Sequence, residues 1–175
     1  MSIDPRYPIG QFVPQTAYSG HERQANMAVL AAAHSKLRDA VAGLSEAQVN
    51  TAYRDGGWTV RQVTHHLPDS HANMYIRLKL ALTESEPVIT PYDEGAWALL
   101  ADNDSVPLEV SIAMLEAVHS RLLGVLTALP ERDWLRVYRH PENGAVSVER
   151  ALALYAWHAS HHVAQITQLR QRMGW

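Results

Sequence analysis

The chain has 175 residues, 47% of them hydrophobic, and a formal net charge of -3 when histidine is counted as neutral. This length and apolar fraction favour one globular domain spanning residues 1–175, with a sizeable core. The slightly negative charge gives no electrostatic reason to expect nucleic acid or an anionic membrane as a partner. The lack of cysteine excludes disulfides, thiolate metal ligands and a cysteine nucleophile. The ten histidines direct attention to metal or acid–base chemistry.

Targeting and membrane signals are weak in this sequence. No apolar run approaches the roughly 20 residues of a membrane span. Residues 1–15 do not have the basic segment followed by an apolar stretch that marks a secretory signal. We therefore expect a cytoplasmic protein that acts on a small-molecule partner.

Residues 1–18 predict an extended arm before the first helix. They contain prolines and glycine at positions 5, 8, 10 and 14, which oppose regular structure. Apolar side chains at Ile9, Phe12 and Val13 are expected to hold this arm against the surface of the domain.

Four long helices are predicted from their caps and from apolar residues at three- and four-residue spacings. Residues 19–22 (SGHE) and 59–62 (TVRQ) both have the form of a capping box. A proline suits the first turn of the third helix, and a serine caps the fourth. The helices are expected from Ser19 to Val41, from Thr59 to about Leu82, from Pro107 to before Pro130, and from Ser147 to near the C-terminus.

The connections between these helices contain shorter elements. Short helices are predicted at residues 45–49 and 93–101, and Asn143-Gly144 is a favourable turn for a small hairpin. The connection over residues 83–106 is long enough to cross the molecule and is of a kind that is often functional. The predicted fold is all-α: a four-helix bundle with an extended N-terminal arm and a long loop between the second and third helices.

The run WHASHHVAQI at 157–166 places three histidines in the fourth helix. His158 and His162 are four residues apart and share one face, whereas His161 lies about 100° around the axis from His162. The face of the pair continues through small or apolar residues, so it is expected to point into the core, where an unpaired imidazole is costly. A pair with this spacing suits a metal ion held against a helix.

His66 on the second helix is the candidate for a third ligand. If the second and fourth helices are neighbours, His66 meets the pair, and three histidines with an open position are the pattern of a catalytic metal site. The alternative that spacing alone leaves open is that these histidines are ordinary core or surface residues. The polar stripe that contains His66 comprises Gln62, His66, Asp69, Ser70, Asn73 and Arg77.

Five segments resemble the DinB superfamily, specifically its YfiT-like branch. They are RYPIGQF (6–12), GWTVRQVTHHLPDSHANMYIRLKLALTE (57–84), PYDEGAW (91–97), HPENG (140–144) and LYAWHASHHVAQITQLR (154–170). By position, the resemblance implies that His66, His158 and His162 are the metal ligands and that His65 and His161 are not. Pro68 is a departure, because alanine is expected there, and a proline inside a helix removes a hydrogen bond and favours a kink.

The resemblance implies a metal-dependent hydrolase that forms a homodimer and binds one divalent metal ion per subunit, zinc by default and nickel as the alternative. Imidazole ligands suit several transition metals. Some relatives instead transfer a low-molecular-weight thiol such as bacillithiol, so an S-transferase with the same ligands is a second hypothesis. A third is a bundle that binds metal without catalysis.

Four further residues are candidates for supporting roles near the metal or the substrate. Asp69 could orient an imidazole or act as a base, with a solvated or structural role as its alternative. Gln165 could hold a water or a ligand, or could be a polar group satisfied between helices. Asn73 and Arg77 could contact an anionic substrate, although for Arg77 an exposed salt bridge is the competing interpretation.

Overall fold

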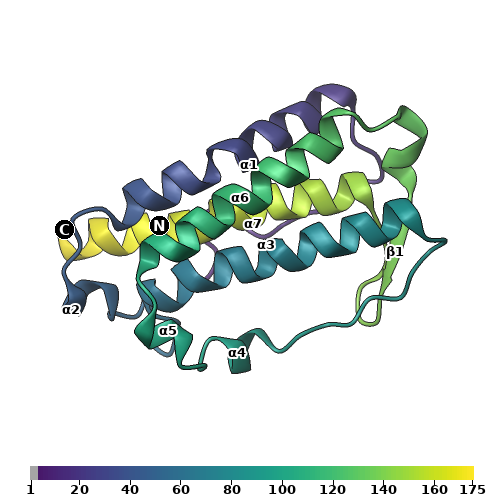
Figure 1. The fold of residues 1–175 in the computed structure, drawn as a ribbon. Helices are drawn as coiled ribbons and strands as arrows, with labels where there is room; N and C mark the ends of the chain where they lie inside the picture. Colours follow the sequence, from purple (N-terminus) through teal and green to yellow (C-terminus); the bar gives the residue numbers. More distant parts are fainter. Residues whose placement is uncertain (1–3) are drawn as a thin grey trace.

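The computed structural model describes residues 4–175, and its frame is a bundle of four long helices (Figure 1). Residues 1–3 of the predicted arm lie outside the described part of the chain. The long helices are α1 (Gly20–Val41), α3 (Val60–Thr83), α6 (Leu108–Thr127) and α7 (Val148–Met173). The short elements are α2 (Glu46–Val49), α4 (Glu94–Trp97), α5 (Asp102–Ser105), the 3-10 helix η1 (Glu131–Leu135), β1 (Val137–His140) and β2 (Gly144–Ser147). The predicted all-α four-helix bundle is confirmed.

The helices do not follow a simple up-and-down order. The helices α1 and α7 run in one direction and α3 and α6 in the other, as the colour gradient shows (Figure 1). The segment from α3 to α6 returns along the length of the bundle and carries α4 and α5. On its way it meets β1, where the Ile89 N–H donates to the Arg139 carbonyl at 3.0 Å. The long connection therefore crosses the bundle, and it makes α3 and α6 parallel neighbours.

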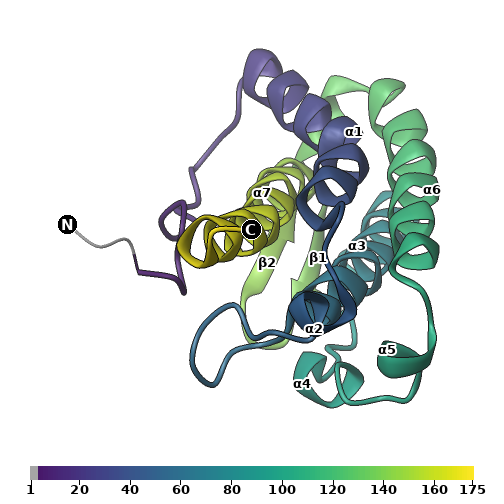
Figure 2. The same ribbon diagram turned by 90° about the vertical axis from the view of Figure 1, so that its left-hand side faces the viewer.

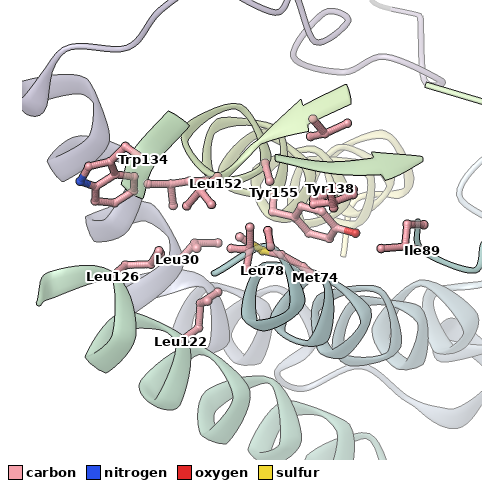
Figure 3. Packing of buried hydrophobic residues seen from close by; sticks show 14 residues of the cluster. Leu30, Met74, Leu78, Ile89, Leu122, Leu126, Trp134, Tyr138, Leu152 and Tyr155 are labelled. Carbon is pink, nitrogen blue, oxygen red and sulfur yellow. The ribbon is translucent and has the colours of Figure 1, made fainter. Parts of the chain in front are cut away.

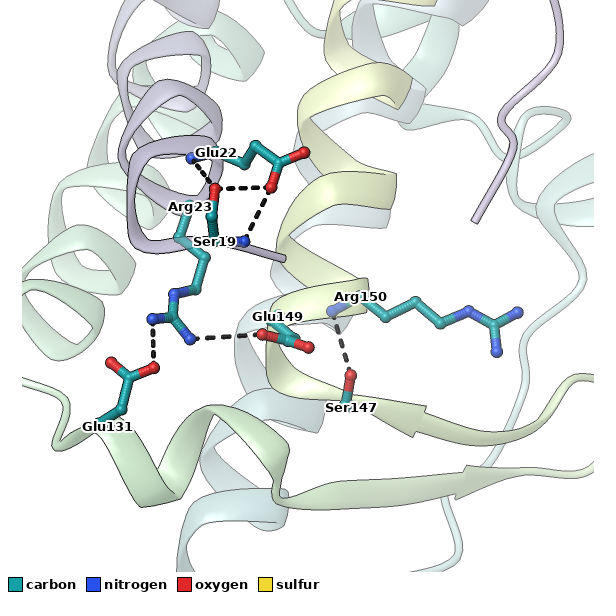
Figure 4. A network of polar contacts seen from close by, with 7 residues as sticks. All are labelled: Ser19, Glu22, Arg23, Glu131, Ser147, Glu149 and Arg150. Atoms are coloured by element: carbon teal, nitrogen blue, oxygen red, sulfur yellow. Dashed lines mark hydrogen bonds and ion pairs between the residues drawn. The ribbon is translucent and has the colours of Figure 1, made fainter. Parts of the chain in front are cut away.

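The predicted helix caps are present. The Ser19 hydroxyl accepts from the N–H of Glu22, whose carboxylate accepts from the Ser19 N–H in return (Figure 4). Thr59 and Gln62 form the same reciprocal pair at the start of α3, and Ser147 caps α7. Each cap satisfies backbone donors that a helix end leaves free, so the ends of three helices are set by local sequence.

Some local predictions differ from the structure. The segment 93–101 contains only the single turn α4, and neither α5 nor η1 was expected, because such short turns carry no periodic pattern. Pro107 is the N-cap of α6 rather than a residue of its first turn. Helix α3 continues through the buried Pro68 without interruption, so this proline does not end the helix that presents His66.

The arm is attached differently from the prediction. Phe12 does pack on the Trp157 ring, with centroids 6.0 Å apart, but Ile9 and Val13 are 46% and 78% exposed, so their predicted role is wrong. The arm is held instead through its backbone, because the Trp157 indole donates to the Gly10 carbonyl at 3.2 Å. A second side chain of α7 makes a similar bond to the arm, which lies beside this helix (Figure 2).

The hydrophobic core consists of two clusters, one toward each end of the bundle. The first, partly shown in Figure 3, includes Leu30, Met74, Leu78, Leu122, Leu126, Leu152 and Tyr155. The second includes Leu37, Val60, Val63, Leu67, Ile112, Leu115, Ile166 and Leu169. In each long helix, a histidine lies in the sequence between the residues of the two clusters: His34, His71, His119 and His158. We call this level of the bundle, together with His66 and His162, the histidine layer.

Helix α6 has the length and apolar composition of a membrane span, the one such helix in residues 4–175. It is not an uninterrupted apolar run, since it contains Glu109, Glu116 and Arg121. It packs against α1 and α3, with Ile112 and Leu122 fully buried. A helix that packs within a bundle can have the same length and apolar composition as a membrane span.

Candidate metal centre

The three predicted ligands converge on one point between α3 and α7. His158 Nε2 lies 3.3 Å from His66 Nε2 and 3.1 Å from His162 Nε2. One ligand atom from each residue can be chosen so that all three lie within 4.8 Å of one another. His66 and His162 are buried, and His158 is half-buried. Three ring nitrogens that face one another need either protons or a cation between them, and this donor set fits a transition-metal ion.

The partner of His162 fixes which of its nitrogens is free. The Gln165 Oε1 atom lies 2.8 Å from His162 Nδ1 and can only accept, so Nδ1 carries the proton and Nε2 presents a lone pair to the cluster. The Gln165 amide in turn donates to His161 Nε2 at 3.0 Å. Gln165 is therefore a buried residue that bonds to both His161 and His162 and orients the His162 ring.

A second chain of hydrogen bonds supports His158. Its Nδ1 lies 3.3 Å from His71 Nε2, and His71 Nδ1 lies 2.7 Å from His119 Nε2. If His158 offers its Nε2 lone pair to a metal, its Nδ1–H donates to His71, and the His71 Nδ1–H donates to His119. Both supporting histidines are almost fully buried. The chain therefore fixes the tautomer of one ligand through two further imidazoles.

Neither His71 nor His119 was among the candidate site residues predicted from the sequence. The signal was present, because each residue interrupts an otherwise apolar stripe. His71 lies between Leu67 and Met74 on α3, and His119 lies four residues after Leu115 on α6. A histidine at such a position is buried, so it requires a polar partner.

The electrostatics of the cluster favour neutral imidazoles. Burial lowers the pKa of His66 to about 4. Burial, and then the neighbouring imidazoles, lower the pKa values of His158 and His162 well below the ordinary value. Neutral rings at physiological pH leave the nitrogen lone pairs free for coordination, and they do not reduce the charge of a bound cation.

An indole ring packs on two of the three histidines, and a cavity adjoins the third. The Trp58 ring packs on His66 at a centroid distance of 4.7 Å and stacks on His162 at 6.4 Å. His158 also lines a cavity of about 320 Å³, together with Ser70, Tyr138 and Tyr155. A small molecule in this cavity would lie beside His158, and access of this kind is what an open metal site requires.

The two histidines that were not assigned to the metal make other contacts. His65 Nδ1 lies 2.7 Å from the Ser111 hydroxyl and links α3 to α6. His161 accepts from Gln165 and stacks on Trp157 at 4.6 Å. Their nearest partners are thus outside the three-nitrogen cluster.

Asp69 and Asn73 do not contact the ligands. The half-buried Asp69 side chain makes no hydrogen bond to a described residue. Burial, followed by the charge of Asp102 in α5, raises its pKa to about 6. The Asn73 side chain donates to the backbone carbonyl of Asp69 at 3.0 Å. The Asn73 side chain is thus bonded to its own helix, and neither residue contacts the three histidines.

Comparisons with known proteins agree with this geometry. The family model of the DinB superfamily matches residues 30–166. The chain belongs to the DinB superfamily. The YfiT protein of Bacillus subtilis is 45% identical over 99% of this chain and 98% of its own length. Its solved structure superimposes with a TM-score of 0.95 over 98% of both chains.

Two further relatives extend the comparison. A protein of Oceanobacillus iheyensis is 50% identical over 79% of this chain and 80% of its own length. Like YfiT, it carries the provisional name of a metal-dependent hydrolase. The four-helix bundle protein TT2238 has a TM-score of 0.56 at 17% identity, a likeness that concerns the fold alone. The structure of YfiT is described as having an unusual four-helix bundle topology, and this member of the superfamily has parallel α3 and α6.

Proposed function

We propose that this protein is a metal-dependent hydrolase whose ligands are His66, His158 and His162. The observation that carries the proposal is the convergence of three Nε2 atoms, one of them from His158, which lines a cavity, with two of the rings oriented by hydrogen bonds to other buried side chains. A divalent ion bound there would lower the pKa of a coordinated water to about 7 and so supply hydroxide for attack on the substrate. The names of the relatives at 45% and 50% identity support the same activity.

The protein side chains would perform three tasks. The neutral imidazoles would hold the cation without cancelling its charge. Gln165 and the pair His71–His119 would keep the ligand rings turned toward it. Trp58, which packs on His66 and His162, would limit solvent at these two rings. We propose zinc as the resident ion, with nickel as the alternative, because imidazole ligation suits both.

The first test is the metal content of freshly purified protein by inductively coupled plasma mass spectrometry. We expect about one equivalent in the wild type and little in His66→Ala. His65→Ala is the matched control, because this neighbouring histidine bonds to Ser111 instead, and we expect it to retain its metal. A wild type without stoichiometric metal, even after reconstitution with zinc and nickel, would rule out the proposal.

Hydrolysis is then assayed with the loaded protein against ester and amide panels, with and without low-molecular-weight thiols. We expect turnover in the absence of thiol, and loss of turnover in His66→Ala. Turnover that requires an added thiol would replace the hydrolase by an S-transferase with the same ligands. Bound metal without turnover in either assay would leave a metal-binding bundle.

A further inference from the structure

Arg77 is a buried cation without a counterion. Its side chain comes from α3 and is 8% exposed. The guanidinium Nη1 donates to the Tyr155 hydroxyl at 3.5 Å, and the buried Nε has no hydrogen-bond partner in the described part of the chain. Among residues 4–175, several other arginines form ion pairs with aspartate or glutamate carboxylates, but Arg77 forms none. An unpaired buried charge is costly, so a position like this indicates a missing anion.

Arg77 lines the same cavity as His158. Tyr155 contacts both residues, because its ring lies 5.7 Å from the His158 ring and its hydroxyl accepts from Arg77. A molecule that fills the cavity would therefore meet both the Arg77 guanidinium and His158, one member of the histidine cluster. The volume of about 320 Å³ is that of a site for a small molecule.

The cavity is also electropositive. Arg150 of α7 lines it and bonds only to the Ala145 carbonyl through its guanidinium, at 3.5 Å. Figure 4 shows the Arg150 side chain extending away from the ion pair between Arg23 and Glu149. The one carboxylate in the lining belongs to the exposed Glu94. Two guanidinium groups therefore face a single, solvated acid.

We infer that this cavity binds a substrate with a carboxylate or phosphate group, held by Arg77, while the bond to be broken lies at the histidine cluster. Guanidinium recognises both anions through paired N–H donors, so the shared chemistry is a planar fork of donors around two anionic oxygens. The inference rests on the proposed function for the reacting end of the substrate. The anion site itself requires no metal and can be measured separately.

The test uses inorganic phosphate and succinate as probes on metal-free and zinc-loaded protein, followed by isothermal titration calorimetry and thermal unfolding. Arg77→Met removes the charge but keeps an unbranched apolar stem, and Arg77→Lys keeps the charge but loses the fork. The control is Arg132→Met, because that side chain is 85% exposed and lies outside the cavity. We expect at least one probe to bind wild type and Arg132→Met equally, and to bind Arg77→Met at least tenfold more weakly.

Thermal unfolding keeps the test valid if a variant is altered in stability. An anion that binds the folded state raises the melting temperature by mass action, so the probe should raise it in wild type but not in Arg77→Met. Without probe, Arg77→Met should be at least as stable as wild type, because it no longer buries an unpaired charge. Response to phosphate alone points to a phosphate-bearing substrate, and response to succinate alone to a carboxylate.

Equal binding of both probes by wild type and Arg77→Met, or binding by neither protein, would overturn the inference. This failure is distinct from failure of the proposed function. Arg77-dependent binding in metal-free protein, combined with absence of bound zinc or nickel, would retain the anion site and reject the hydrolase. Stoichiometric metal without Arg77-dependent binding of either probe would reject the anion site and leave the proposed hydrolase in place.

Discussion

The two apolar clusters are buried and the histidine layer between them is buried or half-buried, but the clusters and the layer are held together by different forces. The clusters are filled by aliphatic side chains whose contacts are non-directional, so their stability depends on volume and buried area. In the histidine layer, ring nitrogens lie 2.7 to 3.3 Å from a partner, and each bond restricts the tautomer of the next ring. Changes in the clusters should therefore alter stability, whereas changes in the layer should alter metal binding.

The largest effect is expected for the ligands on α7. His158→Ala or His162→Ala should remove nearly all bound metal, because two imidazoles hold a transition metal much less firmly than three. His161→Ala should retain most of it, since this ring bonds to Gln165 and stacks on Trp157. Metal content by mass spectrometry checks the three variants side by side. Equal loss in all three would contradict the assignment of the ligand face.

A cluster residue provides the contrasting change. Leu37 is fully buried in the second cluster, so Leu37→Ala should lower the free energy of unfolding by about 2–5 kcal/mol through lost contacts and a cavity. Its affinity for zinc, measured by competition with a chelator, should stay within about twofold of wild type. A large loss of affinity with little loss of stability in urea would show that clusters and layer are not separate.

Acidification should lower the free energy of unfolding of the metal-free protein through the histidine layer. Burial lowers the pKa of His66 to about 4 in the folded protein, whereas an exposed histidine has an ordinary pKa of about 6.5. As pH falls below 6.5 the unfolded chain gains this proton and the folded one does not, so stability falls until the pH approaches 4. Each unit of difference corresponds to about 1.4 kcal/mol, roughly 3 kcal/mol in all for this group.

Urea unfolding of metal-free protein between pH 7 and pH 5 measures this dependence. Metal-free His66→Gln should show a shallower slope, by about the contribution of one proton, because the group that titrates in the unfolded chain is gone. A wild-type stability that does not change over this range would show that the ring is protonated in the folded state.

The smallest effect is expected for the residue behind a ligand. His71→Leu keeps a buried apolar volume but removes the partner of His158 Nδ1, and loss of such a partner typically costs 10–100-fold in metal affinity. The control is His65→Leu, on the same helix but bonded to Ser111. Chelator competition measures both, and nitrogen chemical shifts of His158 report its tautomer. Equal metal affinities in the two variants, with an unchanged His158 tautomer, would show that His71 contributes only to packing.

Local sequence determined a large part of this molecule. The capping boxes at Ser19 and Thr59 fix where two helices begin, because the partner of each cap lies three residues away. The four-residue spacing of His158 and His162 places both on one face for the same reason, and the Asn143-Gly144 turn predicts the hairpin, where Gly144 has a φ of +68°. The segments that resemble the DinB superfamily supported the prediction of His66 as the third ligand.

Tertiary structure alone decided which distant residues meet. His66 is 92 residues from His158, and their contact depends on α3 and α7 being neighbours, which no local pattern states. His71 and His119 come from α3 and α6, and these helices are parallel neighbours only because the long connection returns along the bundle. Arg77 could not be distinguished from a surface arginine until its burial and missing partner were visible. Spacing within a helix is fixed by backbone geometry, whereas contacts between helices depend on the packing of the whole chain.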